Sequence, residues 1–150
     1  MIEVTRRQTL IGGMSVLAVS YLGVLPALSK SNGYEEAVAK FTGGKDAKEG
    51  RIKIDVPEIA ENGNTVPLSV SVESPMSKDD YVKRVMILAD GNPRPGVATF
   101  NYTPDSGVAE ASTRIRLAGT QNLVVLAEMS DGSYYKAIRQ VKVTIGGCGG

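Results

Sequence analysis

The sequence predicts an all-β protein: an immunoglobulin-like antiparallel β-sandwich with one short N-terminal helix and a flexible glycine-rich C-terminal arm. Three observations support this fold class. Segments after Gly50 alternate polar and apolar residues with a period of two, which is typical of strands with one buried face. Clusters of Gly, Asn, Asp and Pro separate these segments and indicate turns. The chain then ends in a run of glycines around one cysteine, which no strand would carry.

Residues 1–29 precede the predicted domain and resemble an export signal. A charged start is followed by a moderately apolar run over residues 10–27, with small residues before a polar segment. The adjacent Arg6 and Arg7 indicate the twin-arginine type, which exports folded proteins, so we expect a periplasmic protein. An ordinary secretory signal and an N-terminal membrane anchor are the alternatives, although a span needs ~20 mostly apolar residues.

A helix is predicted over residues 31–42, at the start of a domain that we place at residues 30–145. Asn32 can cap this helix, and Glu35 completes a capping-box-like arrangement. Gly43 and Gly44 end it. Its apolar stripe, which we expect to cover one end of the β-domain, consists of Tyr34, Val38 and Phe41.

Seven short strands complete the domain, and this number favours a sandwich. The turn at residues 130–132 separates two strong strand segments and predicts a tight hairpin. Pro67 predicts an edge position for its strand, because proline cannot donate to a neighbouring strand. The predicted strands cover residues 51–56, 66–73, 82–89, 97–102, 111–117, 123–129 and 134–145.

Composition excludes several classes of function. Removing residues 1–29 removes two arginines and one glutamate, which lowers the formal net charge from +1 to zero. We therefore expect no nucleic-acid partner and no membrane surface after signal removal. The chain contains no histidine and one cysteine, so a usual zinc or copper site and a Cys/His or Ser/His catalytic pair are excluded. We expect no metal and no catalytic residue.

The candidate site is Cys148, which cannot form an internal disulfide because it is the only cysteine. An extended chain spans ~3.3–3.6 Å per residue, so a tether from Ile145 would carry this thiol about 10 Å beyond the domain. The missing side chains would let the tether enter a narrow cleft of another protein. Residues 146–150 are therefore predicted to form the flexible arm, which contains Gly146, Gly147, Gly149 and Gly150.

The signal, the leading helix, the sandwich, the segment at residues 59–68 and the terminal arm together resemble the SoxY family. These proteins are the sulfur-substrate carriers of the bacterial Sox thiosulfate-oxidising system. The resemblance implies a covalent carrier without a cofactor, rather than an enzyme. Cys148 would hold a thiosulfate-derived S-thiosulfonate and then a persulfide.

The resemblance also implies partners that perform the chemistry. A SoxZ-like β-sandwich subunit would form a heterodimer with this chain. A haem-containing enzyme would conjugate thiosulfate, a hydrolase would release sulfate, and a sulfur dehydrogenase would oxidise the remaining sulfur.

Two other interpretations of the C-terminus assign the chain to a different class of protein. A structural β-sandwich could use Cys148 to join a partner through an intermolecular disulfide. A ubiquitin-like sulfur carrier would use the terminal Gly149 and Gly150 as a thiocarboxylate, but its ATP-dependent activation belongs to the cytoplasm and conflicts with the export signal.

Overall fold

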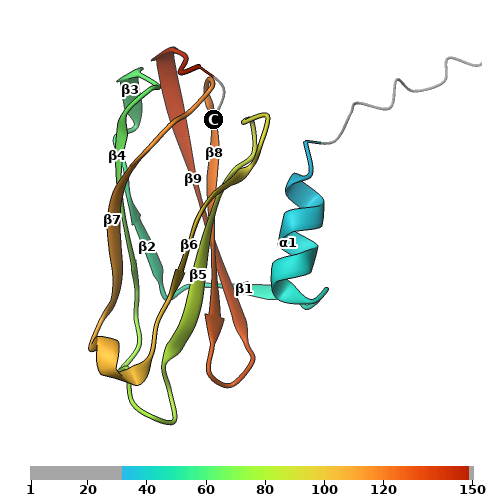
Figure 1. The fold of residues 1–150 in the computed structure, drawn as a ribbon, viewed down its shortest axis with the longest axis vertical. Helices are drawn as coiled ribbons and strands as arrows, with labels where there is room; N and C mark the ends of the chain where they lie inside the picture. Colours follow the sequence, from blue (N-terminus) through green and yellow to red (C-terminus); the bar gives the residue numbers. More distant parts are fainter. Residues whose placement is uncertain (1–31, 149–150) are drawn as a thin grey trace, which may run out of the picture.

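The computed structural model describes residues 32–148 as two facing β-sheets with one helix beside them (Figure 1). The predicted signal at residues 1–29, with Arg6 and Arg7, lies outside the described residues, as do Gly149 and Gly150. The helix and strands are α1 (Tyr34–Thr42), β1 (Ala47–Glu49), β2 (Ile52–Asp55), β3 (Ile59–Asn62), β4 (Val66–Val72), β5 (Val82–Ala89), β6 (Gly96–Asn101), β7 (Ala109–Ile115), β8 (Gln121–Met129) and β9 (Tyr134–Ile145), with a 3-10 turn at Pro104–Ser106.

The larger sheet has the strand order β1-β9-β8-β5-β6, and β3 also pairs with β9. The smaller sheet has the order β2-β4-β7. Side chains from the two inner faces form one apolar core, as the period-two patterns predicted. The sandwich is thereby confirmed as the fold class.

Strand β8 is almost entirely buried because both of its faces are covered. Leu123 and Val125 point into the core between the sheets, whereas Val124 and Leu126 lie on the outer face under α1. This double coverage explains why the strand reads as a continuous apolar run rather than an alternating one.

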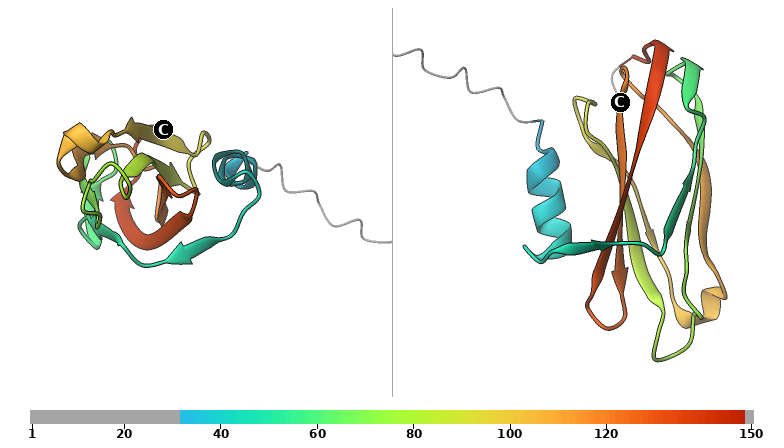
Figure 2. Two further views of the ribbon diagram at one scale, coloured as in Figure 1. Left: turned by 90° about the horizontal axis from the view of Figure 1, so that it is seen from below. Right: turned by 180° about the vertical axis from the view of Figure 1, so that it is seen from behind.

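Helix α1 stands outside the ring of strands, and the chain runs from it through β1 around the sandwich (Figure 2). Phe41 is buried and makes an edge-to-face contact with Tyr134 of β9, with ring centroids 6.0 Å apart. Tyr34 and Val38 pack against the same apolar cluster. The predicted stripe therefore does cover the β-domain.

The start of α1 differs from the prediction. The helix begins at Tyr34, and its N-cap is Gly33 in the left-handed conformation, with no side-chain capping bond. Asn32 instead links two elements: its Oδ1 accepts the Tyr34 N–H at 3.2 Å, and its Nδ2 donates to the Asn92 carbonyl at 3.0 Å. The predicted end at Gly43 is confirmed, with φ of 63°.

Two strands were not predicted, and both pair with β9 in parallel. Strand β1 aligns Ala47 with Tyr134, and β3 aligns Ile59 with Lys142. The sandwich is therefore not purely antiparallel. Strands of three and four residues carry too little alternation to be recognised in a sequence.

The prediction of an edge strand at Pro67 was wrong for the strand as a whole. Strand β4 is the middle strand of the smaller sheet. Strand β2 pairs only with Ser69–Val72, however, so at Pro67 the sole neighbour is Arg114 of β7. The missing proline N–H is tolerated because the sheet is locally two strands wide there.

The hairpin between β8 and β9 is confirmed. The Met129 N–H donates to the Ser133 carbonyl at 2.9 Å, and the Asp131 carboxylate accepts the Ser133 N–H at 2.8 Å.

Among residues 32–148, no helix is long and apolar enough to cross a membrane.

Candidate functional site

Cys148 lies three residues beyond the end of β9, and this end of β9 is where Ile145 pairs with Asn62 of β3. Figure 1 shows β3 beside this end of β9. Its side chain is exposed as a free thiol. Its backbone N–H, in contrast, donates a hydrogen bond of 3.1 Å to the Oδ1 atom of Asn64. The thiol is thus presented to solvent by a backbone that contacts the body of the domain.

Two loops of the body hold the residues before Cys148. The Gly147 N–H donates to the Leu117 carbonyl at 2.8 Å. The loops also bond to each other, because the Leu117 N–H donates to the Gly63 carbonyl at 2.8 Å. Gly63 in turn donates its N–H to the Ile145 carbonyl at 2.8 Å. We call the two segments Gly63–Asn64 and Leu117–Gly119 the docking loops.

Three glycines allow this close approach. A Cβ atom on Gly146 would lie within 3.0 Å of the Ala118 carbonyl oxygen. A Cβ atom on Gly147 would lie 2.7 Å from the Gly63 carbonyl oxygen, and one on Gly63 would lie 2.7 Å from the Gly147 nitrogen. Each of these obstacles is a backbone atom, which cannot rotate away as a side chain can. Only glycine therefore fits at these positions in the observed conformation.

A buried polar network fixes the second docking loop. Asn92 is 2 % exposed, and its amide bonds to the backbone on both sides of Leu117: Nδ2 donates to the Arg116 carbonyl and Oδ1 accepts the Ala118 N–H, each at 2.9 Å. The Nε2 atom of Gln121 donates to the same Oδ1 at 2.9 Å. Buried polar groups with every bond made rigidify a loop. The contact surface for Gly146 and Gly147 is therefore held from within the domain.

The sequence placed Gly146 and Gly147 in a tether extending beyond the domain, and the structure differs by laying them against the docking loops. Each hydrogen bond contributes about 0.5–1.5 kcal/mol. Ordering a residue's backbone costs about 1–2 kcal/mol. Gain and cost are of similar size for so short a segment, so the flexibility of the arm stays a prediction that these contacts do not contradict.

Sequence reasoning missed Gly63, Asn64 and Leu117 as neighbours of the arm. The Asn-Gly-Asn run at residues 62–64 predicts a turn and belongs to the segment that resembles the SoxY family, but neither observation points to the arm. The turn does form: the Asn62 Oδ1 accepts the Asn64 N–H at 2.9 Å. The available signal was the crowding of glycine at two separate points of the sequence, but nothing in the sequence joined them.

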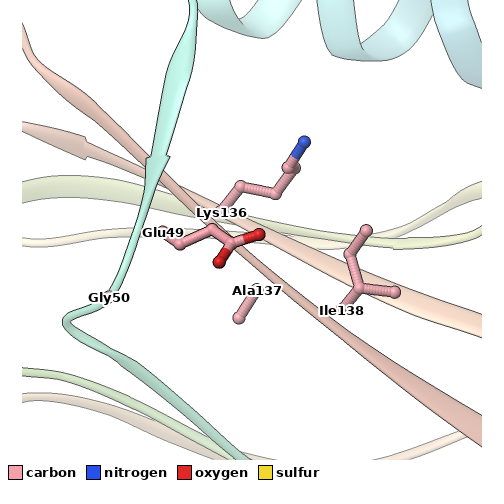
Figure 3. Close-up of a pocket in the computed structure, with 5 residues that line it drawn as sticks. All are labelled: Glu49, Gly50, Lys136, Ala137 and Ile138. Carbon is pink, nitrogen blue, oxygen red and sulfur yellow. The ribbon is translucent and has the colours of Figure 1, made fainter.

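In the part of the chain that the structure describes, the side chain that hydrogen-bonds to Cys148 is the neutral amide of Asn64. Among residues 32–148, no group of three Asp, Glu, His or Cys side chains could hold a metal ion. The hollow in Figure 3 lies elsewhere, where Lys136 and Ile138 of β9 approach Glu49 and Gly50, and it contains no arm residue. The geometry can present a thiol, and other proteins would have to activate it.

A cluster of three paired charges lies beside α1, away from Cys148. Glu128 of β8 is buried and forms ion pairs with Lys83, at 3.2 Å, and with Arg84. Burial alone would raise the pKa of this carboxyl, but hydrogen bonds from Arg84 and Lys83 outweigh it and hold the pKa below its ordinary value. Arg84 also lies over the Phe41 ring at 4.7 Å, which links the helix to the sheet.

Similar folds occur in proteins of low sequence identity. Superoxide reductase (neelaredoxin) from Ignicoccus hospitalis has a TM-score of 0.56 at 16% identity, with 63% of this chain and 80% of that chain covered. A putative superoxide reductase from Thermotoga maritima has a TM-score of 0.53 at 15% identity, with 69% and 89% covered. These likenesses show the fold alone. No curated protein matches the sequence.

The sulfur carrier protein SoxY from Chlorobium limicola f thiosulfatophilum is similar in both sequence and structure. Its TM-score is 0.63 at 38% identity, and the match covers 74% of this chain and 96% of that chain. The family model described as sulfur oxidation protein SoxY matches residues 38–148, a range that includes both docking loops and ends on the cysteine. The chain therefore belongs to the SoxY family of sulfur oxidation proteins.

Proposed function

We propose that this protein is a covalent carrier of sulfur intermediates in thiosulfate oxidation, with Cys148 as the attachment site. The observation that carries the proposal is the exposed thiol at the end of a segment without side chains. Its relative from Chlorobium is a sulfur carrier protein, which supports the same role here. The chemistry is carried out by partner enzymes, since the groups that the described part of the chain bonds to Gly147 and Cys148 are a backbone carbonyl and a neutral amide.

The proposed cycle begins with conjugation. The Cys148 thiolate and the outer sulfur of thiosulfate form a sulfur–sulfur bond, and the two electrons released by this oxidation would pass one at a time to the haem-containing conjugating enzyme. Water then attacks the terminal sulfonate sulfur in a hydrolase, which releases sulfate and leaves a persulfide on the carrier. A sulfur dehydrogenase takes six electrons from the outer persulfide sulfur, which gains three oxygen atoms from water and becomes a sulfonate. A second hydrolysis releases this group as sulfate and regenerates the thiolate.

The proposal includes a periplasmic location and a permanent partner subunit. The twin-arginine-type segment at residues 1–29 supports export to the periplasm in the folded state. A SoxZ-like subunit, which would share the sandwich architecture, completes the carrier as a heterodimer. No cofactor is proposed apart from the sulfur held on Cys148.

Intact-mass spectrometry tests the attachment. The full chain is incubated with thiosulfate and the conjugating enzyme, beside a Cys148→Ser variant as the matched control. We expect a thiosulfate-derived adduct on the unchanged chain that a reductant removes, and none on Cys148→Ser. An unchanged chain that takes up no mass would refute the proposal.

The exposed thiol also suits a disulfide to another chain, which is the alternative function. Non-reducing electrophoresis of protein from its native host separates the two. A carrier is expected mainly as monomer with small adducts, whereas a structural protein would be quantitatively cross-linked.

A further inference from the structure

We infer that the docking loops form a binding place for the arm of the same chain, so that the arm exchanges between a docked and a released position. We call Asn64 the latch, meaning the docking-loop residue whose side chain hydrogen-bonds to the backbone of the docked arm. Its Oδ1 atom accepts the Cys148 N–H at 3.1 Å, while its own N–H is held by Asn62. The latch therefore engages the backbone of Cys148 and leaves the thiol uncovered.

The pattern of glycines supports docking independently of the latch. A Cβ atom added to Gly146 or to Gly147 would lie closer to backbone atoms of the docking loops than van der Waals contact allows. Gly119 belongs to the second docking loop, Leu117–Gly119, yet a Cβ atom added to it would meet nothing within 4 Å. An arm that merely hung free would place no such steric demand on its first residues. Glycine before Cys148 is thus required by the protein's own body and not only by the clefts of other proteins.

The docking loops are built before the arm reaches them. Asn92 and Gln121 bind the second loop from inside the domain, and their side-chain hydrogen bonds go to backbone groups of loops and to each other rather than to residues 146–148. The bonds from Leu117 to Gly63 close the two loops on each other. Loss of the arm would therefore leave the docking loops in place, which is the condition for reversible binding.

The consequence for carriage rests on the proposed function, whereas docking itself does not. A docked arm shows its thiol to solvent at a fixed place, and a partner with a shallow site could load it there. A partner with a deep pocket must bind the released arm, and its apparent affinity falls with the released fraction. Asn64 would then set how the carrier is divided between the two kinds of partner.

Amide hydrogen exchange, measured by NMR on the full unloaded chain under reducing conditions, tests the inference. We expect the Gly147 amide of the unchanged protein to exchange about three- to tenfold more slowly than in the Gly146→Ala and Asn64→Ala variants, the range expected for one hydrogen bond. Gly119→Ala is the matched control and should retain the slow exchange. Asn64→Asp, which keeps an acceptor oxygen, should restore it.

Equal exchange of the Gly147 amide in the unchanged protein and in Gly146→Ala would overturn the inference. The Leu123 amide in the core of β8 serves as the internal reference and should be unaffected by all four variants. If Leu123 also lost protection in Gly146→Ala, the residue would belong to the body of the fold and the assignment of a separable arm would be wrong. Because the protein carries no sulfur in this experiment, a failure of the proposed function would leave the result unchanged.

Discussion

The Cys148 N–H donates to the Oδ1 atom of Asn64, a residue 84 positions earlier in the chain. This bond joins Cys148 to the turn between β3 and β4. A second bond, from the Gly147 N–H to the Leu117 carbonyl, reaches the other docking loop. The base of the arm is therefore a tertiary structure built from three distant segments, which holds the backbone of Cys148 and leaves its thiol exposed.

The first prediction concerns Gly63→Ala. The new Cβ would lie 2.7 Å from the Gly147 nitrogen and closer still to the Leu117 carbonyl oxygen, and neither backbone atom can turn aside. Overpacking of this kind costs about 1–3 kcal/mol of unfolding free energy. Urea denaturation should show this loss, with an unchanged slope against denaturant. Gly119→Ala should stay within about 0.5 kcal/mol of the unchanged protein, and equal stability of the two variants would contradict the packing argument.

The second prediction concerns Asn92→Ala. The substitution removes the amide that bonds to the Arg116 carbonyl and to the Ala118 N–H, so both backbone groups lose their partner. Gln121 loses one of its two acceptors and keeps the Gly119 carbonyl. A buried group that loses its hydrogen bond costs about 1–3 kcal/mol, so we expect a loss of at least this size in thermal or urea unfolding. Asn101→Ala, at the exposed end of β6, is the control and should be nearly neutral.

The third prediction concerns Phe41→Ala. Phe41 joins α1 to the sheet through its contact with Tyr134 and through the guanidinium of Arg84 above its ring. Truncating a buried phenylalanine costs about 3–5 kcal/mol. We expect a destabilised protein in which hydrogen exchange accelerates first in α1, because the strands keep their own core. Equal acceleration across β8 would show that the helix is not a separable layer.

Much of the fold could be predicted because strand alternation is a local signal. The limits of β5 and β9 agree with the prediction residue for residue, since turn residues flank both strands. Strands β1 and β3 could not be predicted, because their partner is β9 and their own three or four residues carry no pattern. Local sequence signals do not predict a strand whose formation depends on pairing with a strand far away in the sequence.

In the candidate site, too, the residue with a local sequence signal could be predicted and the residues brought near it by tertiary structure could not. Cys148 could be identified from the sequence because a lone cysteine among glycines is visible without any structure. Its neighbours Asn64 and Leu117 could not, because an Asn-Gly-Asn turn has the same sequence whether or not an arm lies on it. The contacts exist only once β3 and β9 lie side by side.

The fourth prediction is a dependence of stability on pH that comes from Glu128. Its carboxylate is held by Arg84 and Lys83, which keeps its folded-state pKa below the ordinary value of 4.5. The unfolded chain therefore binds a proton at a higher pH than the folded protein does. This contribution to stability is fully present above the unfolded-state pKa and is lost as the pH falls through the lower folded-state pKa.

Glu128→Gln isolates the effect. At neutral pH the variant should be less stable, because Arg84 and Lys83 lose a charged partner; both are about half exposed, so solvent screens the loss to about 1–2 kcal/mol. Below a pH of about 4.5 the difference from the unchanged protein should begin to shrink, because the unfolded chain takes up the proton first, and it should vanish once the pH has fallen below the lower folded-state pKa, where the protonated glutamate resembles the amide. Urea unfolding between acid and neutral pH measures both regimes, with Glu73→Gln on the exposed surface as control. A difference that stayed constant across this range would mean that packing, and not charge, holds Glu128 in place.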